Sequence, residues 1–189
     1  MFVPVKDVGD VYFTGCTTCT NRCCEGGKFS LAPLILEDFE RVYKNFEIFF
    51  GYIDGNLKAL MVLNRGRTDA GKIDTCEYLE NGICTIYENR PPACKLYPLS
   101  PYYDEIYVDS SCEAVSREGE FLVSPEKINP NFKDIRLENF SSKLQETLLW
   151  LDLIKDDLEE VDEVMGIKLL KYIGKIDDRF MSMHLNSIN

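Results

Sequence analysis

The sequence contains one histidine and one tryptophan among its 189 residues, and it has no long apolar run. The single imidazole, His184 near the frayed C-terminal end, argues against a Cys/His zinc finger and against catalysis by paired histidines or a Ser-His-Asp triad. No segment approaches the roughly 18 consecutive apolar residues that a transmembrane helix needs. Residues 1–7 lack the basic segment and apolar core of a signal peptide. These absences predict a cytoplasmic protein that does not enter a membrane.

Basic residues are in the minority. Lys and Arg number 21 against 32 Asp and Glu, and the net charge at pH 7 is −11. Such a charge repels phosphate backbones and anionic lipids, which argues against nucleic-acid and membrane partners. The chain also lacks a Gly-x-Gly-x-x-Gly dinucleotide motif and a Walker A motif. Its apolar share of 45% is nevertheless sufficient for a packed core.

The pattern of apolar residues predicts an α+β fold. Apolar residues at three- and four-residue steps over residues 33–50 predict a helix that begins at Pro33 and ends near Gly51. Asp54-Gly55 and Asn81-Gly82 each separate two apolar runs, which is typical of β-hairpins. The fold expected for the first half is therefore one of small antiparallel hairpins and Cys-rich loops around a metal centre.

Further along the chain, short strands are predicted at residues 105–109 and 120–123, and a polar loop at residues 64–74. After about residue 134 the cysteines and prolines give way to a capping box at Ser142 and Gln145. Heptad-like apolar spacing follows up to Met165 and predicts a helix, with a second helix over residues 167–183. We expect a Cys-rich metal-binding domain at residues 1–125 and a helical extension at residues 134–189 that packs on it.

The cysteines carry the most chemical information. They number eight and are Cys16, Cys19, Cys23, Cys24, Cys76, Cys84, Cys94 and Cys112. The first four lie in one short loop, where Cys16 and Cys19 form a Cys-x-x-Cys turn and Gly26-Gly27 leaves room for backbone. Adjacent residues in extended chain point to opposite sides, so Cys23 and Cys24 suit two neighbouring centres or one ligand and one further thiol. The Asn81-Gly82 hairpin is expected to bring Cys76 and Cys84 together.

Three interpretations of these cysteines remain open: metal ligands, disulfides and inert core thiols. A reducing compartment and the crowding of four cysteines in one loop favour metal ligands. Ligation by sulfur alone selects zinc or an iron–sulfur cluster. The spacing departs from the bacterial ferredoxin run and from the radical-SAM pattern, and the chain lacks the strand–helix context of a thioredoxin motif.

Several short motifs follow one another in a fixed order. They are Cys16-x2-Cys19-x3-Cys23-Cys24, Cys76, Gly82-x-Cys84-x-Ile86-Tyr87, Arg90-Pro91-x2-Cys94-x2-Tyr97-Pro98 and Cys112. Over roughly residues 12–115 this series resembles the YkgJ-type cysteine-cluster family, described as a zinc- or iron-chelating domain, with a related module in flagellin lysine-N-methylases. The chain departs from the family at Lys95, where Arg is usual, and in its three-residue gap before Cys23. The resemblance implies a metal site.

We expect the eight cysteines to bind a [4Fe–4S] cluster, with Zn²⁺ as the alternative, because adjacent and surplus thiols exceed the four ligands of a zinc site. Arg90 and Lys95 are candidate cofactor-binding residues, since their cations would offset the charge of a thiolate-rich centre. Arg90 can equally be an ordinary surface or capping residue. Tyr87 and Tyr97 are expected to shield the site from water.

Two other classes of function stay open. The first is an iron–sulfur-dependent oxidoreductase or a lysine N-methylase-like enzyme, for which no catalytic residue stands out. The second is a zinc-binding structural or interaction module. In that case the acidic stretch at residues 152–163, predicted as a solvated helix face, would dock a basic protein or deliver metal.

Overall fold

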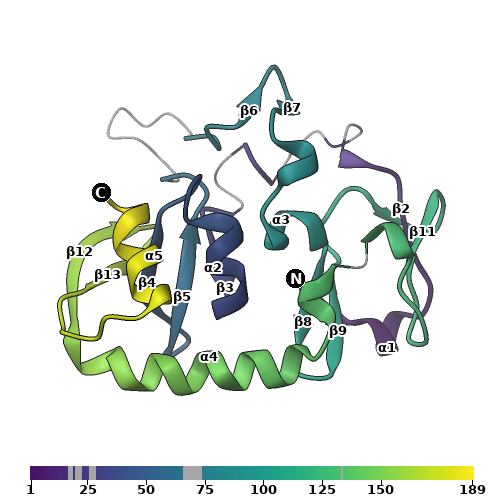
Figure 1. The fold of residues 1–189 in the computed structure, drawn as a ribbon. Helices are drawn as coiled ribbons and strands as arrows, with labels where there is room; N and C mark the ends of the chain where they lie inside the picture. Colours follow the sequence, from purple (N-terminus) through teal and green to yellow (C-terminus); the bar gives the residue numbers. More distant parts are fainter. Residues whose placement is uncertain (17–18, 20–22, 26–28, 66–73, 133) are drawn as a thin grey trace. The chain divides into compact units, whose positions relative to one another are not determined.

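The computed structural model describes residues 1–16, 19, 23–25, 29–65, 74–132 and 134–189, which include all eight cysteines. The chain divides into two compact units: unit 1 is Met1–Arg22 with Pro92–Ser142, and unit 2 is Cys23–Pro91 with Lys143–Asn189. The described part contains five α-helices and thirteen strands (Figure 1). All paired strands are antiparallel. The predicted α+β class with small antiparallel sheets is therefore confirmed.

Unit 1 consists of two small sheets and short helices. Its elements are β1 (Phe2–Pro4), α1 (Val5–Val8), β2 (Val11–Phe13), α3 (Pro92–Leu96), β8 (Leu99–Tyr102), β9 (Glu105–Asp109), β10 (Val115–Ser116), β11 (Glu120–Val123), η3 (Pro130–Phe132) and η4 (Ile135–Leu137). The strands form two three-stranded sheets, in the orders β1-β9-β8 and β10-β2-β11. A cluster of aliphatic residues forms the core: Val5, Val11, Leu99, Val108, Leu122 and Val123.

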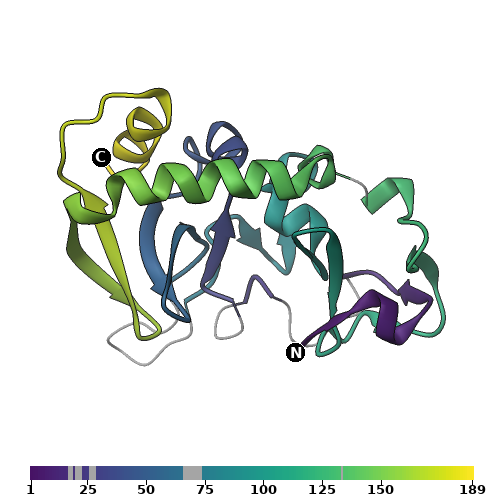
Figure 2. The same ribbon diagram turned by 90° about the horizontal axis from the view of Figure 1, so that it is seen from below.

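Unit 2 contains a larger sheet. Its elements are β3 (Leu31–Leu34), α2 (Leu36–Val42), β4 (Ile48–Ile53), β5 (Asn56–Val62), β6 (Leu79–Glu80), β7 (Ile83–Cys84), η2 (Tyr87–Asn89), most of α4 (Phe140–Ile154), η5 (Lys155–Asp157), β12 (Leu158–Val164), β13 (Ile167–Tyr172) and α5 (Arg179–Ser187). Five strands form one sheet in the order β12-β13-β4-β5-β3, and β6 and β7 form a separate hairpin. Figure 2 shows α2, α4 and α5 on the same side of the five-stranded sheet.

Aromatic rings join these helices to the sheet. The Phe39 ring of α2 lies 6.0 Å from the Trp150 ring of α4 and 6.0 Å from the Phe180 ring of α5. Trp150 also contacts Phe50 of β4, at 5.9 Å between ring centroids. Its Nε1–H donates to Asp178, whose carboxylate also caps the N-terminus of α5. Large buried rings of this kind dominate core energetics, so the three helices are held firmly on the sheet.

The chain's single histidine closes a gap in this sheet. Strands β13 and β4 are paired only at Leu170 and Phe50. Fully buried His184 of α5 accepts a hydrogen bond from the Tyr172 N–H at Nε2, and its Nδ1 lies 2.7 Å from the Ile48 carbonyl oxygen. Because Nε2 accepts, the neutral ring carries its proton on Nδ1 and donates it to Ile48. The expectation that His184 lies at a frayed end is therefore wrong.

The helix predicted near residues 33–50 is confirmed in its central part but is shorter than expected. It is α2, Leu36–Val42, and the Asp38 carboxylate accepts the Ile35 N–H at its start. Pro33 instead lies in β3, an edge strand, where a missing N–H is tolerated. Gly51 lies within β4, where a Cβ would come within 2.8 Å of the Lys168 carbonyl oxygen. The apolar spacing over residues 46–50 thus marks a buried strand rather than a helix face.

The C-terminal helical pair is confirmed as α4 and α5, but the residues between them were assigned wrongly. Residues 158–172 form the hairpin β12–β13 instead of helix. Met165 and Gly166 both have positive φ angles, of 51° and 79°, as a tight hairpin turn requires. The acidic residues Glu159 to Glu163 therefore lie on an edge strand rather than on a helix face. Docking of a basic protein there stays a prediction.

The other local predictions have different outcomes. The hairpins at Asp54-Gly55 and Asn81-Gly82 are confirmed, as are strands β9 and β11. The loop predicted at residues 64–74 and the Gly26-Gly27 segment lie largely or wholly outside the described residues. That residues 1–125 form a metal-binding domain, with residues 134–189 packed on it, stays a prediction.

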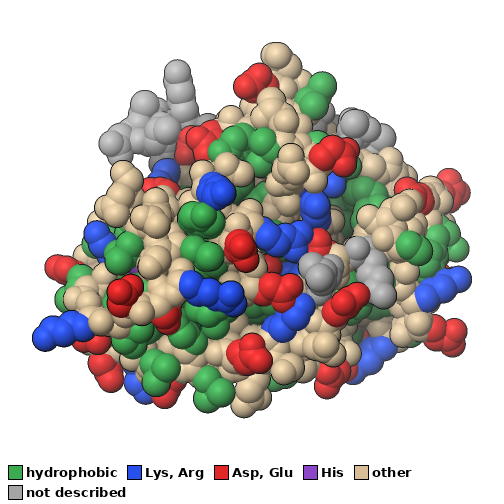
Figure 3. Space-filling model, in the orientation of Figure 1, with side chains coloured by type: hydrophobic (Ala, Val, Ile, Leu, Met, Phe, Trp, Pro, Cys, Tyr) green, Lys and Arg blue, Asp and Glu red, His purple; other side chains and the backbone are tan. Residues whose placement is uncertain are grey.

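The surface carries both signs of charge. Acidic and basic side chains are interspersed over the described residues that are visible in Figure 3. None of the helices in the described ranges combines the length and apolar character needed to cross a membrane.

Candidate metal centre

Unit 2 brings three segments that carry cysteine to one place. The Cys76 N–H donates to the Cys24 carbonyl oxygen at 3.0 Å, which ties the N-terminal cysteine loop to the segment before β6. Cys84 ends β7 and is paired with Leu79, whose N–H donates to the Cys76 carbonyl oxygen. Cys76, Cys84 and Cys24 thus gather around the small β6–β7 hairpin.

The hairpin geometry follows from its turn. Asn81 and Gly82 have φ angles of 48° and 76°, the pair of positive values that a two-residue hairpin turn requires. Thr85 N–H donates to the Tyr78 carbonyl oxygen at 2.8 Å and closes the base of the hairpin. The local Asn-Gly signal therefore sets the approach of Cys84 to Cys76.

Cys76 is the most sheltered thiol of this group, with 7% of its surface exposed. Burial raises the pKa of the Cys76 thiol, and the charges of Cys24 and Cys84 raise it further, while a hydrogen bond from the Tyr78 backbone lowers it. Mutual repulsion of this kind is expected wherever thiolates are crowded together. A cation or a cluster core would relieve it, because metal binding replaces the thiol proton.

Unit 2 also contains Cys23, next to Cys24, and unit 1 contains the remaining four cysteines. Cys19 N–H donates to the Cys16 carbonyl oxygen at 3.2 Å, which agrees with the Cys-x-x-Cys turn, although the two residues between lie outside those described. Cys94 lies in the short helix α3, which begins at Pro92. Cys112, 7% exposed, follows β9 in a turn where its N–H donates to the Asp109 carbonyl oxygen.

A buried carboxylate organises the turn that carries Cys112. Asp109 is 2% exposed and accepts hydrogen bonds from Ser111 N–H and Ser111 Oγ at Oδ1, and from the Tyr97 hydroxyl at Oδ2. The Met1 amino group lies 2.9 Å from Oδ1. Burial alone would raise the pKa of this carboxyl, but these hydrogen bonds outweigh it and lower the pKa to about 2. Asp109 is therefore an anion at every ordinary pH.

Asp109 was not among the predicted site residues. Its local signal is the series Asp109-Ser110-Ser111-Cys112, since an Asp side chain often accepts the N–H two residues later and forms an Asx turn. The bond from Tyr97, twelve residues away, has no such local signal.

The two predicted cationic residues lie in different settings. The Arg90 guanidinium carbon is 3.6 Å from the centre of the Tyr87 ring, and Arg90 Nε donates to the Tyr87 carbonyl oxygen at 2.7 Å. This geometry agrees with the expected capping alternative for Arg90. Lys95 lies half-buried in α3, in the position after Cys94. The role of both residues in cofactor binding stays a prediction.

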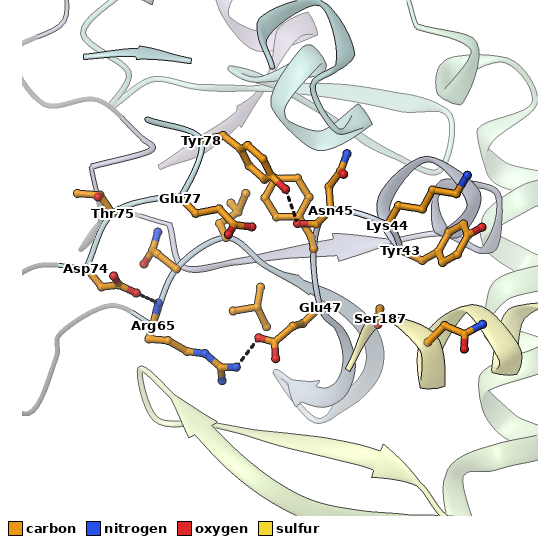
Figure 4. A pocket seen from close by; sticks show the side chains of 15 residues that line it. Tyr43, Lys44, Asn45, Glu47, Arg65, Asp74, Thr75, Glu77, Tyr78 and Ser187 are labelled. Carbon is orange, nitrogen blue, oxygen red and sulfur yellow. Dashed lines mark hydrogen bonds and ion pairs between the residues drawn. The ribbon is translucent and has the colours of Figure 1, made fainter. Parts of the chain in front are cut away.

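A pocket of about 560 Å³ lies beside the Cys76 segment of unit 2, and Thr75, Glu77 and Tyr78 line it (Figure 4). The Arg65 guanidinium points toward Glu47 across this pocket and forms an ion pair with it. The Tyr78 hydroxyl donates to the Asn45 carbonyl oxygen at 3.2 Å. These contacts fix the wall of the pocket that carries the residues flanking Cys76.

The donor chemistry fits a thiolate-bound metal. All eight cysteines are described, and none is part of a disulfide. Soft sulfur donors suit zinc and iron–sulfur clusters. Across the described ranges, no three Cys, His, Asp or Glu side chains already form a closed metal-binding group.

The comparison with protein families agrees with this chemistry. A family model described as "CxxCxxCC: Putative zinc- or iron-chelating domain" matches residues 15–121, more than half of the chain. No curated protein and no solved structure matches. The first four cysteines have one residue more between the second and third than the family's name gives. Because the match covers more than half of the chain and includes all eight cysteines, the chain belongs to the CxxCxxCC family of zinc- or iron-chelating domains.

Proposed function

We propose that this protein binds a [4Fe–4S] cluster through its cysteine thiolates, in the cytoplasm. The observation that carries the proposal is the convergence in unit 2 of Cys76 and Cys84 with Cys24, which lies more than fifty residues before them in sequence. Metal ligands must approach one another in this way.

Two features favour iron–sulfur over zinc. A structural zinc site is satisfied by four ligands, whereas this chain has eight cysteines, none of them in a disulfide. Cys23 and Cys24 are adjacent, and a single tetrahedral ion rarely takes both side chains of such a pair. The family description includes both zinc and iron, so the metal is the finer part of the proposal.

The test is anaerobic purification followed by elemental analysis and a visible absorption spectrum. We expect iron and acid-labile sulfide in equal amounts, and broad visible absorption that disappears on oxidation. A colourless protein that contains stoichiometric zinc would replace the iron–sulfur proposal with the zinc alternative. A protein that contains neither metal and rebinds neither after reduction would contradict both.

Substitution at Cys76 separates ligation from folding. Cys76→Ser should remove most of the bound metal, because a buried thiolate at the centre of the group is lost. Thr75→Ser is the matched control, since it makes a change of similar size at the adjacent residue. Equal metal content in the two variants would exclude Cys76 as a ligand.

A further inference from the structure

The turn that carries Cys112 is held by a polar network rather than by apolar packing alone. Oδ1 and Oδ2 of Asp109 face two different segments of unit 1. Oδ1 accepts from Ser111, within the Cys112 turn, and Oδ2 accepts from the Tyr97 hydroxyl at 2.9 Å, on the segment that follows α3. The Asp109 carboxylate therefore joins the Cys112 turn to the segment that carries Cys94.

Backbone hydrogen bonds reinforce the same connection. Asp109 N–H donates to the Pro98 carbonyl oxygen at 2.9 Å, and Cys112 N–H donates to the Asp109 carbonyl oxygen at 3.0 Å. Val115 N–H in turn donates to the Cys112 carbonyl oxygen at 3.0 Å. The main chain on both sides of Cys112 is thus fixed, and Asp109 takes part in two of these three bonds.

The Tyr97 hydroxyl has one proton, and its hydrogen bond to the Asp109 carboxylate uses that proton. Burial and this hydrogen bond raise the pKa of Tyr97, and the charge of Cys112 raises it further. Tyr97 therefore remains a donor to the carboxylate that shapes the turn in which Cys112 lies.

We infer that Tyr97 and Asp109 are positioning residues for Cys112: the carboxylate fixes the turn, and the phenol hydroxyl holds the carboxylate in place, so that the turn presents the sulfur in one orientation. The inference rests on the proposed function, because it assigns Cys112 to a metal centre. Residues that orient metal ligands typically change metal affinity by about 10- to 100-fold. A change in the surroundings of a coordinating sulfur also changes the reduction potential of a cluster.

The experiment compares Tyr97→Phe with a matched control in the same unit. Tyr97→Phe keeps the ring and removes only the hydroxyl. Tyr107→Phe removes a hydroxyl that donates to Glu105 at 3.2 Å, and both of these residues lie on β9. Both variants are prepared as the full chain with its metal bound. The readouts are the rate of metal release to an excess of chelator, and the reduction potential of the cluster or, for a zinc protein, the charge-transfer spectrum after cobalt substitution.

We expect Tyr97→Phe to accelerate metal release about 10-fold and to change the reduction potential or shift the cobalt–sulfur band, because the turn no longer holds the sulfur in one orientation. Tyr107→Phe should stay within about twofold of the unsubstituted protein. A purely structural role for Tyr97 would change the release rate without changing the potential or the spectrum, and would overturn the inference. So would unchanged values for every readout.

Asp109→Asn provides a second variant of nearly the same shape. The amide can still accept from Ser111, but it loses the charge that attracts the Tyr97 hydroxyl. We expect faster metal release here as well, with a spectral shift in the same direction as in Tyr97→Phe, because both variants weaken the same hydrogen bond. If the unsubstituted protein binds no metal, the proposed function and this inference both fail. If it binds metal and the variants match it, only the inference fails.

Discussion

The two compact units stabilise their cysteine-bearing segments in different ways. In unit 2, a five-stranded sheet and three helices enclose fully buried large side chains such as Phe39, Phe50 and Leu169. In unit 1, two three-stranded sheets share a small aliphatic core, and the Cys112 turn depends on the hydrogen bonds of Asp109. Apolar burial contributes about 25 cal/mol for each Å² removed from water, so the larger core should make unit 2 the more stable unit when no metal is bound. Metal binding should therefore contribute most to the stability of unit 1 and of the β6–β7 hairpin.

Metal removal is the strongest test of this difference. Structural thiolate sites contribute roughly 10–16 kcal/mol of apparent folding free energy. After chelation in reductant we expect the amides of Leu79, Cys112 and Val115 to lose most of their protection, while strands β4 and β5 keep theirs. Hydrogen exchange with mass spectrometry measures both regions in one sample. If metal removal changed the protection of the two regions equally, or changed neither, the expected difference between the units would be wrong.

Truncation of Trp150 tests the core of unit 2. Trp150 is 8% exposed and contacts the rings of Phe39, Phe50 and Phe180. Trp150→Ala should lower the free energy of unfolding by about 3–5 kcal/mol, because it leaves a large cavity. Leu153→Ala, on the same helix but 69% exposed, is the control and should change stability by less than about 0.5 kcal/mol. Denaturant unfolding followed by far-UV circular dichroism measures both.

Acid should weaken unit 2 through His184. Burial lowers the pKa of His184 to about 4, and the hydrogen bond to Ile48 opposes this only in part. In the unfolded chain the imidazole binds a proton near pH 6.5. The contribution of buried, neutral His184 to the free energy of unfolding is therefore complete above that pH and is lost as the pH falls toward 4. The loss amounts to roughly 3 kcal/mol.

The pH test uses His184→Gln, which can both donate and accept but does not titrate. The difference in unfolding free energy between the native protein and this variant should shrink as the pH is lowered from 7 toward 4. Taking the difference cancels the carboxylates that titrate in the same range. Parallel pH profiles would show that His184 does not titrate as the structure indicates.

The smallest expected effect concerns the hairpin that presents Cys84. Gly82 has a φ of 76°, where a side chain costs about 1 kcal/mol. Gly82→Ala should lower the stability of the β6–β7 hairpin by that amount and accelerate metal release about fivefold, while Asn81→Gly should stay close to the native protein. Chelator-chase kinetics measure the difference. If Gly82→Ala released metal at the native rate, the conformation of this turn would not affect metal binding.

Local patterns predicted some elements well because their causes are local. Asn81-Gly82 and Asp54-Gly55 fix their hairpins through positive φ angles, which few other residues adopt. The predicted ends of two helices, at residues 33–50 and from Ser142 to Met165, were wrong, because apolar spacing alone does not distinguish a buried strand from a helix face. In β4, Phe49 and Phe50 point to opposite faces of the sheet and are both buried, Phe50 against Trp150 and Phe49 in a cluster with Leu60 and Leu169.

The family, the number and order of the thiols, and the hairpin near Cys76 and Cys84 could all be predicted from the amino-acid sequence, since each depends on residue identity and short spacing. That His184 completes a sheet, and that Asp109 accepts a hydrogen bond from the Tyr97 hydroxyl, became visible only in the folded chain. These contacts join residues that the fold brings together across separate strands and helices. Their energy comes from burial and from hydrogen bonds that no local pattern encodes.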